Sequence, residues 1–120
     1  MIVTLAKEFH FEASHRLLHL PASHPCHHLH GHSYRVIVEV TGEVDTRTGF
    51  LIDYADLKAI VQPIIDRVDH KHLNDIPGMT YTSAEDIARW LWDGLKPSLP
   101  MLSRIVIHET ASTRCEYWGN

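Results

Sequence analysis

Apolar and polar residues alternate along the first fifteen positions, and this alternation limits the folds that are open to the chain. The odd positions up to His15 are apolar except for Lys7 and the last one, in the order Val3, Leu5, Lys7, Phe9, Phe11, Ala13 and His15. Because successive side chains of a strand point to opposite faces of a sheet, this period of two predicts a strand with one buried face.

A second alternating segment follows a loop that contains Pro21 and Pro25. One of its faces would carry histidine, tyrosine and valine side chains, namely His30, His32, Tyr34, Val36, Val38 and Val40. Arg35 and Glu39 would lie on the opposite face, and the segment ends near Gly42. We therefore expect a second strand that can pair with the first.

The period changes between Asp53 and Val68, where apolar residues recur three and four positions apart: Leu57, Ile60, Val61, Ile64, Ile65 and Val68. This spacing predicts a helix with one apolar face. Asp53 is the expected N-cap, because its carboxylate can accept hydrogen bonds from the free amides of the first turn. Pro63 lies inside the apolar face and is expected to kink the helix or to break it near Gln62.

A second helix is expected to begin at Ser83, with Asp86 three residues later as a weaker form of the capping box, and to stop at Pro97. Two further strands are expected at residues 105–109 and 114–118. The resulting order predicts an α+β fold (ββααββ), an antiparallel four-stranded sheet with two helices on one face. The 120 residues contain no repeat or linker, so residues 1–120 should form a single domain.

Composition excludes several classes of function. The net charge of −4 and the lack of a basic stripe argue against a nucleic-acid partner. The chain contains neither a long apolar run nor an export leader, so we expect no membrane association and a cytoplasmic location. Cys26 and Cys115 should then remain thiols.

The chain has 11 histidines, and their density between His15 and His32 suggests a metal site. His30 and His32 lie two apart on a predicted strand, so both side chains project from the same face. His15 ends the apolar face of the first strand, where a hairpin-like neighbour could bring the three imidazoles together. Three protein ligands are typical of a catalytic zinc site, in which the fourth position is kept for water or substrate.

A closed structural zinc site is the alternative. Such a site needs four ligands, usually from paired motifs such as two cysteines two to four residues apart, and the chain has no such pair. Spacing alone also leaves open other ligand sets that draw on His24, His27 and His28. Solvated surface histidines remain the simpler interpretation of His10, His19, His24 and His108.

Two acidic positions complete the candidate site. Asp69 precedes His70 and could fix its tautomer, although a polar helix end with a histidine near the C-terminal dipole is the simpler interpretation. Glu109 lies where the strand pattern expects a core residue, so its carboxylate should find a partner with several donors. Arg104 or Arg114 could be that partner, and so could a ligand with an amidine-like edge, such as a pterin.

Together these residues resemble the 6-pyruvoyl-tetrahydropterin synthase family, which includes the 6-carboxy-tetrahydropterin synthases. The resemblance covers nearly the whole chain. It depends on five ordered motifs: Phe11-Glu12-Ala13-Ser14-His15, Cys26-x-x-x-His30-Gly31-His32, Gly49-Phe50-Leu51-Ile52-Asp53-Tyr54, Asp69-His70-x-x-Leu73-Asn74 and the strand of Glu109. The short gap after Cys26 and the segment Leu73-Asn74-Asp75-Ile76-Pro77-Gly78 are similar to the bacterial 6-carboxy branch. Thr82-Ser83-Ala84-Glu85 departs from the Pro-Thr-Ser/Ala-Glu that members commonly have.

The resemblance implies a T-fold that assembles into a barrel, commonly as a homohexamer of two trimers with active sites between subunits. It also implies a lyase that converts 7,8-dihydroneopterin triphosphate to 6-carboxy-5,6,7,8-tetrahydropterin in the synthesis of queuosine. Zn²⁺ would be held by His15, His30 and His32, with Cys26 as general base, Asp69 and His70 as its relay, and Glu109 as the pterin anchor. The alternatives are a pyruvoyl synthase, which keeps the side chain, and a zinc-buffering or scaffold protein that is not an enzyme.

Overall fold

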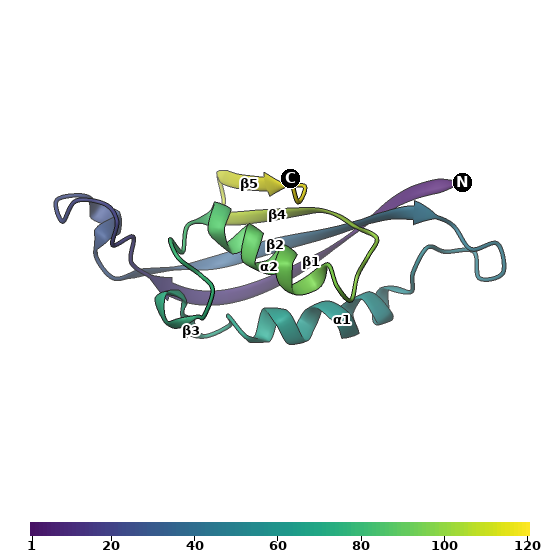
Figure 1. Ribbon diagram of the computed structural model, residues 1–120, viewed down its shortest axis with the longest axis horizontal. Helices are drawn as coiled ribbons and strands as arrows, with labels where there is room; N and C mark the ends of the chain where they lie inside the picture. The colour runs from purple at the N-terminus through teal and green to yellow at the C-terminus, as the bar shows by residue number, and fades with distance from the viewer.

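Two long antiparallel strands, β1 (Ile2–His15) and β2 (His30–Glu43), form the middle of the sheet in the computed structural model, which describes residues 1–120 (Figure 1). Their predicted inward faces are buried: Phe9, Phe11 and Ala13 from β1 lie beside the core positions of β2, which are Tyr34, Val36, Val38 and Val40. The period-two prediction is therefore confirmed for both strands. The connection between them projects from one end of the sheet, and the N-terminus lies at the other end.

The sheet has five strands rather than the expected four, in the order β3-β1-β2-β4-β5. The additional strand, β3 (Lys71–His72), runs parallel to β1, so the expectation of a purely antiparallel four-stranded sheet was wrong. The turn at His70 makes this pairing possible: its backbone φ is +57° and its N–H donates to the Glu12 carbonyl at 2.6 Å. A strand of two residues has no period that a sequence pattern could reveal.

The C-terminal half of the sheet consists of β4 (Leu102–Thr110) and β5 (Thr113–Tyr117). β4 begins three residues earlier than the alternation indicated. The reason is a register shift: Glu39 pairs with Arg104 and Val40 with Leu102, so Ser103 is an extra residue that interrupts the period of two.

Both helices cover the same face of the sheet, as expected (Figure 1). α1 (Tyr54–Asp66) packs on β1, and α2 (Ala84–Leu95) packs on β4 and β5. The apolar core lies between these layers, and neither helix is long and apolar enough to cross a membrane. Two short 3-10 turns, η1 (Pro25–His27) and η2 (Leu73–Asp75), complete the secondary structure.

The predicted break of α1 at Pro63 does not occur, because the helix continues to Asp66. Asp53 caps its start as expected, accepting from the Ala55 N–H at 2.8 Å. Proline deprives the carbonyl four residues earlier of its donor. That residue, Ala59, is exposed, so water can satisfy its carbonyl and the helix persists.

α2 begins and ends where the sequence indicated. Ser83 caps it by accepting from the Asp86 N–H at 3.3 Å, and Leu95 is its last residue, two before Pro97. The capping box is modified, however. The Asp86 carboxylate accepts from the N–H groups of Tyr81 and Thr82, which precede the cap, at 2.7 and 3.1 Å.

Candidate active site

The register of β1 and β2 brings three histidines together at one end of the sheet. His15 lies directly opposite His30, and His32 follows two residues later on the same face. The ring centroids are 4.5, 5.2 and 5.1 Å apart, and one nitrogen from each ring lies within 4.8 Å of the others. Gly31 permits this approach, because a Cβ there would lie 3.0 Å from the Ala13 carbonyl oxygen.

Backbone carbonyls determine which nitrogen of the imidazoles is free. A carbonyl can only accept, so the 2.8 Å contact to the Thr82 oxygen fixes the proton of His15 on Nδ1. The same holds for His30, whose Nδ1 lies 2.7 Å from the His28 oxygen. In the neutral ring this contact leaves the lone pair on Nε2, which is the protonation pattern of metal-binding histidines.

The burial of these side chains also indicates a metal-binding group. His15 is fully buried, and the Nε2 atoms of His15 and His32 are buried without a hydrogen-bond partner. Burial lowers the pKa of His15, and the neighbouring His30 and His32 lower it further, although the Thr82 carbonyl acts in the opposite direction. Neutral imidazoles with free Nε2 atoms fit a divalent transition metal.

The structure does not place the alternative ligands, which are His24, His27 and His28, in this histidine group. Among all histidine, cysteine, aspartate and glutamate side chains, the group of His15, His30 and His32 is the one set that converges. His24 instead accepts from the Cys26 N–H at 3.1 Å, and His27 Nδ1 donates to the Leu20 carbonyl at 3.0 Å. The Cys26 thiol lies outside the group.

Cys26 lies in η1, on the loop that leaves β1 at the histidine end. Its carbonyl accepts from the Leu17 N–H at 2.8 Å, which ties the loop to the end of β1. The side chain is half-buried and forms no disulfide with Cys115. No hydrogen bond joins its thiol to Asp69 or His70 within the chain.

Asp69 and His70 face each other, although they are adjacent in sequence. Asp69 Oδ1 lies 2.9 Å from His70 Nδ1 and also accepts from the Glu12 N–H at 2.9 Å. The Glu12 N–H, with a smaller contribution from His70, lowers the pKa of Asp69. The carboxylate therefore stays charged and holds the Nδ1 proton of an imidazole whose side chain is 77% exposed.

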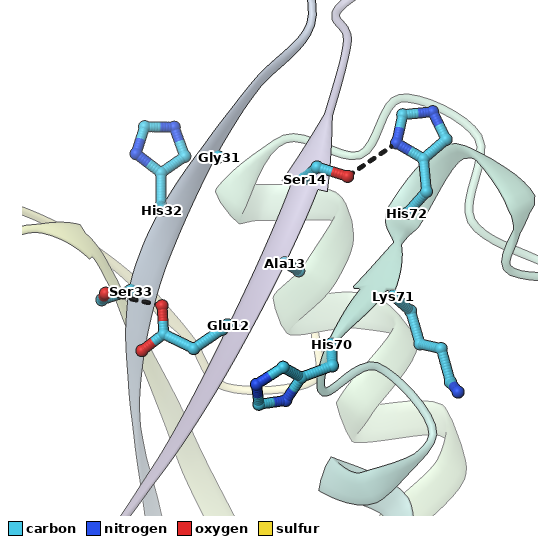
Figure 2. Close-up of a pocket in the computed structure, with 9 residues that line it drawn as sticks. All are labelled: Glu12, Ala13, Ser14, Gly31, His32, Ser33, His70, Lys71 and His72. Atoms are coloured by element: carbon cyan, nitrogen blue, oxygen red, sulfur yellow. Dashed lines mark hydrogen bonds between the residues drawn. The ribbon is translucent and has the colours of Figure 1, made fainter.

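His70 lines a polar cleft of about 540 Å³. Figure 2 shows that the residues lining this cleft come from the neighbouring strands β1, β2 and β3 and from the turn before β3. Lys71, His72 and His32 also line this cleft. Its polar walls are fixed by two hydrogen bonds, from Ser33 Oγ to Glu12 at 2.6 Å and between Ser14 Oγ and His72 Nδ1 at 2.9 Å.

Glu109 lies beside the histidine group, with its Oε1 3.5 Å from His32 Nε2. Neither candidate arginine pairs with it: Arg104 contacts Glu39 and Glu116, and Arg114 contacts Glu116 at 3.2 Å. Its carboxylate, whose side chain is 29% exposed, lines a groove of about 460 Å³ near α2. The carboxylate is therefore available to a ligand in that groove.

Sequence reasoning missed two groups at this site. Thr82 contributes only its backbone carbonyl, which no residue pattern can reveal. Tyr34 was assigned to the apolar face of β2, where it stacks on Phe11 at 4.5 Å, but its buried hydroxyl has no partner in the chain. Burial raises the pKa of Tyr34, and the charge of Glu109 raises it further, so the hydroxyl keeps its proton.

The fold and the site together define a class: single-domain α+β proteins in which two central strands present three histidines that could hold a metal ion. The chain belongs to the 6-pyruvoyl tetrahydropterin synthase family, whose model matches residues 4–120. This membership confirms the resemblance that the five sequence motifs indicated.

Named relatives come from both branches of the family. A 6-carboxy-5,6,7,8-tetrahydropterin synthase of Synechocystis is 35% identical over 119 residues, which cover 94% of this chain and 91% of that protein. One from Haemophilus influenzae is 31% identical and covers 94% and 96%. The human 6-pyruvoyl tetrahydrobiopterin synthase is 38% identical, but the match covers 75% of this chain and 66% of the human protein.

Solved structures agree with the fold. The 6-pyruvoyl tetrahydropterin synthase of Caenorhabditis elegans superposes with a TM-score of 0.92 at 31% identity, covering 100% of this chain and 97% of that one. The Plasmodium vivax enzyme superposes with a TM-score of 0.78 at 20% identity and covers 98% and 97%. The chain therefore has the T-fold of this family.

Proposed function

We propose that this chain is a zinc-dependent lyase that converts 7,8-dihydroneopterin triphosphate and one water molecule to 6-carboxy-5,6,7,8-tetrahydropterin, with release of acetaldehyde and triphosphate. The observation that supports it most directly is the convergence of three imidazoles beside Glu109, whose carboxylate has no arginine partner. The carboxy product is favoured because both carboxy-type relatives match the chain over almost their full length.

His15, His30 and His32 would hold the metal through their Nε2 atoms. When bound, zinc would supply Lewis acidity that makes the substrate's side-chain hydroxyls easier to deprotonate. Glu109 would accept from the two adjacent N–H donors of the pterin edge and so fix the ring in the groove near α2. This role is consistent with a carboxylate that has no arginine partner.

Cys26 would remove a proton from the substrate as the general base. Asp69 would keep the Nδ1 proton of His70 in place, which leaves Nε2 free to take the proton from the thiol. No hydrogen bond joins this pair to the Cys26 thiol of the same chain, so we propose that it serves the Cys26 of a neighbouring subunit. Active sites between the subunits of a homohexamer would meet this requirement.

The triphosphate needs cations, which a chain with a net charge of −4 must concentrate locally. Four basic residues are candidates: Lys7, Arg16, Lys71 and Arg104. Lys71 is favoured, because it alone of the four lines the cleft with His70. Arg104 is already paired with two glutamates.

The pyruvoyl synthase reaction is the second candidate, and the close superposition on the Caenorhabditis elegans enzyme favours it. Incubation with 7,8-dihydroneopterin triphosphate and an assay for acetaldehyde distinguishes the two reactions. We expect acetaldehyde in proportion to the pterin consumed. A pyruvoyl product without acetaldehyde would refute the carboxy assignment. We further propose that the reaction belongs to queuosine synthesis in the cytoplasm.

The remaining alternative is a zinc-buffering or scaffold protein that uses its histidines only to bind metal. For Cys26→Ala we expect unchanged zinc stoichiometry and a loss of turnover of roughly 10²–10⁴-fold, because the thiol lies outside the histidine group. Zinc content by atomic absorption and single-turnover rates provide the measurement. Loss of zinc in this variant would instead favour a closed four-ligand site.

A further inference from the structure

The orientation of one candidate metal ligand depends on a loop outside the sheet. His15 is fully buried, and its Nδ1 donates at 2.8 Å to the carbonyl of Thr82, which lies just before α2. Metal-binding histidines are generally aimed by the acceptor at their other ring nitrogen. The position of the Thr82 carbonyl therefore determines where His15 Nε2 points.

Thr82 adopts a backbone conformation that needs support. Its φ is +59°, in the left-handed region that β-branched residues rarely occupy, and its side chain is fully buried. Such a conformation persists only where contacts with the surrounding structure hold the backbone in place.

The Thr82 hydroxyl donates to the Tyr81 carbonyl at 2.7 Å, and Asp86 holds the backbone amides of this loop. Its Oδ2 accepts from the Tyr81 N–H at 2.7 Å and from the Thr82 N–H at 3.1 Å, and its side chain is 6% exposed. Its Oδ1 pairs with Arg89, which reaches Oδ1 through Nη2 at 2.8 Å and Nε at 3.2 Å. Arg89 also donates to the Gly78 carbonyl at 2.7 Å. The carboxylate is thus anchored on one side and holds two consecutive amides on the other.

We propose that Asp86 is a positioning residue for the metal centre, acting through the Thr82 carbonyl on His15. The proposal rests on the metal-binding role given above to the three histidines. A standard capping box would direct the carboxylate to the N–H of Ser83, where it would stabilise only α2. Here both bonds go to residues before the cap, and one of those residues is the acceptor for His15.

Zinc affinity of the purified chain, measured by competition with a chelating dye after removal of metal, tests the proposal. Asp86→Ala should weaken zinc binding 10–100-fold, as for other groups that orient metal ligands. Asp86→Asn keeps an acceptor oxygen for both amides, so its affinity should stay within about threefold of the original chain. The absorption spectrum of the Co²⁺-substituted chain should change in the alanine variant only.

Asp53→Ala is the matched control, because it removes the aspartate that caps α1 without touching His15. It should lower stability in urea unfolding and leave zinc affinity unchanged. If Asp86→Ala behaves in the same way, with lower stability but unchanged zinc affinity and cobalt spectrum, Asp86 is only a structural residue and the proposal is wrong.

Asp86→Glu covers the case in which Asp86→Ala does not fold. It keeps the charge but moves the acceptor away from the two amides, so zinc affinity should still fall by at least about threefold. Unchanged affinity in this variant would also overturn the proposal, as would an original chain that binds no zinc. A chain that binds zinc and shows these effects but yields no acetaldehyde would refute the proposed reaction and leave this inference intact.

Discussion

Each imidazole of the metal site offers two nitrogens, and the neighbouring backbone determines which one is free. The Thr82 and His28 carbonyls occupy Nδ1 of His15 and His30. The resulting group places one ligand nitrogen from each of three rings within 4.8 Å of the others and does not include the Cys26 thiol. At the residue scale, the chemistry of the site therefore depends on backbone acceptors as much as on the histidines.

Replacing one metal ligand should separate metal binding from folding. We expect His30→Ala to lose bound zinc and to remain folded, because His30 is half-buried and the core contains 22 buried apolar residues without it. Zinc content together with circular dichroism measures both properties. An unfolded His30→Ala variant would favour a structural metal instead.

The Glu109 carboxylate should matter for binding and little for stability. Glu109→Gln keeps the shape but removes the charge, so we expect weaker pterin binding by roughly tenfold or more, since hydrogen bonds to a charged group contribute about 1.5–3 kcal/mol. Pterin titration by fluorescence and urea unfolding provide the measurements.

Glu116→Gln is a suitable control for this variant, because Glu116 pairs with Arg104 and Arg114 and does not line the groove of Glu109. It should change stability by about 1 kcal/mol or less and leave pterin binding intact. A large stability loss in Glu109→Gln with unchanged affinity would instead reveal an internal ion pair.

At the scale of elements, the pairing of β1 with β2 creates the candidate metal site. A shift of one residue in this register would turn His30 and His32 to the opposite face. The buried pairs Phe11–Tyr34 and Phe9–Val36 prevent such a shift, because it would also expose these core side chains. The apolar core and the site are thus specified by the same alternation.

Pro63 allows the stability of α1 to be tested directly. Because Pro63 is exposed and lies near the end of an otherwise regular helix, Pro63→Ala should restore the hydrogen bond to the Ala59 carbonyl without disturbing the core. We expect the free energy of unfolding to rise by about 1–3 kcal/mol, less the entropy that proline removes from the unfolded chain. Urea unfolding that shows no gain would mean that water already compensates fully for the missing bond.

At the scale of the whole molecule, no hydrogen bond joins the Asp69–His70 pair to the Cys26 thiol of the same chain, which makes the proposed assembly testable. Cys26→Ala and His70→Ala should each be inactive alone. If a site combines Cys26 of one subunit with His70 of another, mixed oligomers should regain up to about a quarter of the activity. Refolding the two variants together and measuring turnover tests this. No recovery in mixed oligomers would place both groups of a site in one chain.

The sequence predicted a large part of the fold because most elements are long and amphipathic. The alternation in β1 and β2 indicates which face of each strand is buried, and the apolar stripes of α1 and α2 do the same for the helices. The helix caps, Asp53 and Ser83, are local signals that can be recognised in the sequence. The sequence failed where the pattern was short or interrupted. β3 has only two residues, Ser103 breaks the period of β4, and Pro63 is tolerated because Ala59 faces solvent.

The sequence by itself determined the chemical inventory: the residue types, the strand face that His30 and His32 share, and the family motifs. Only the tertiary structure decided that His15 joins them, that neither arginine neutralises Glu109, and that Asp86 holds the loop that orients His15. The physical reason is that side-chain periodicity is local, whereas these contacts join residues up to 67 positions apart. Such contacts depend on strand register and on backbone carbonyls, which carry no residue-specific signal.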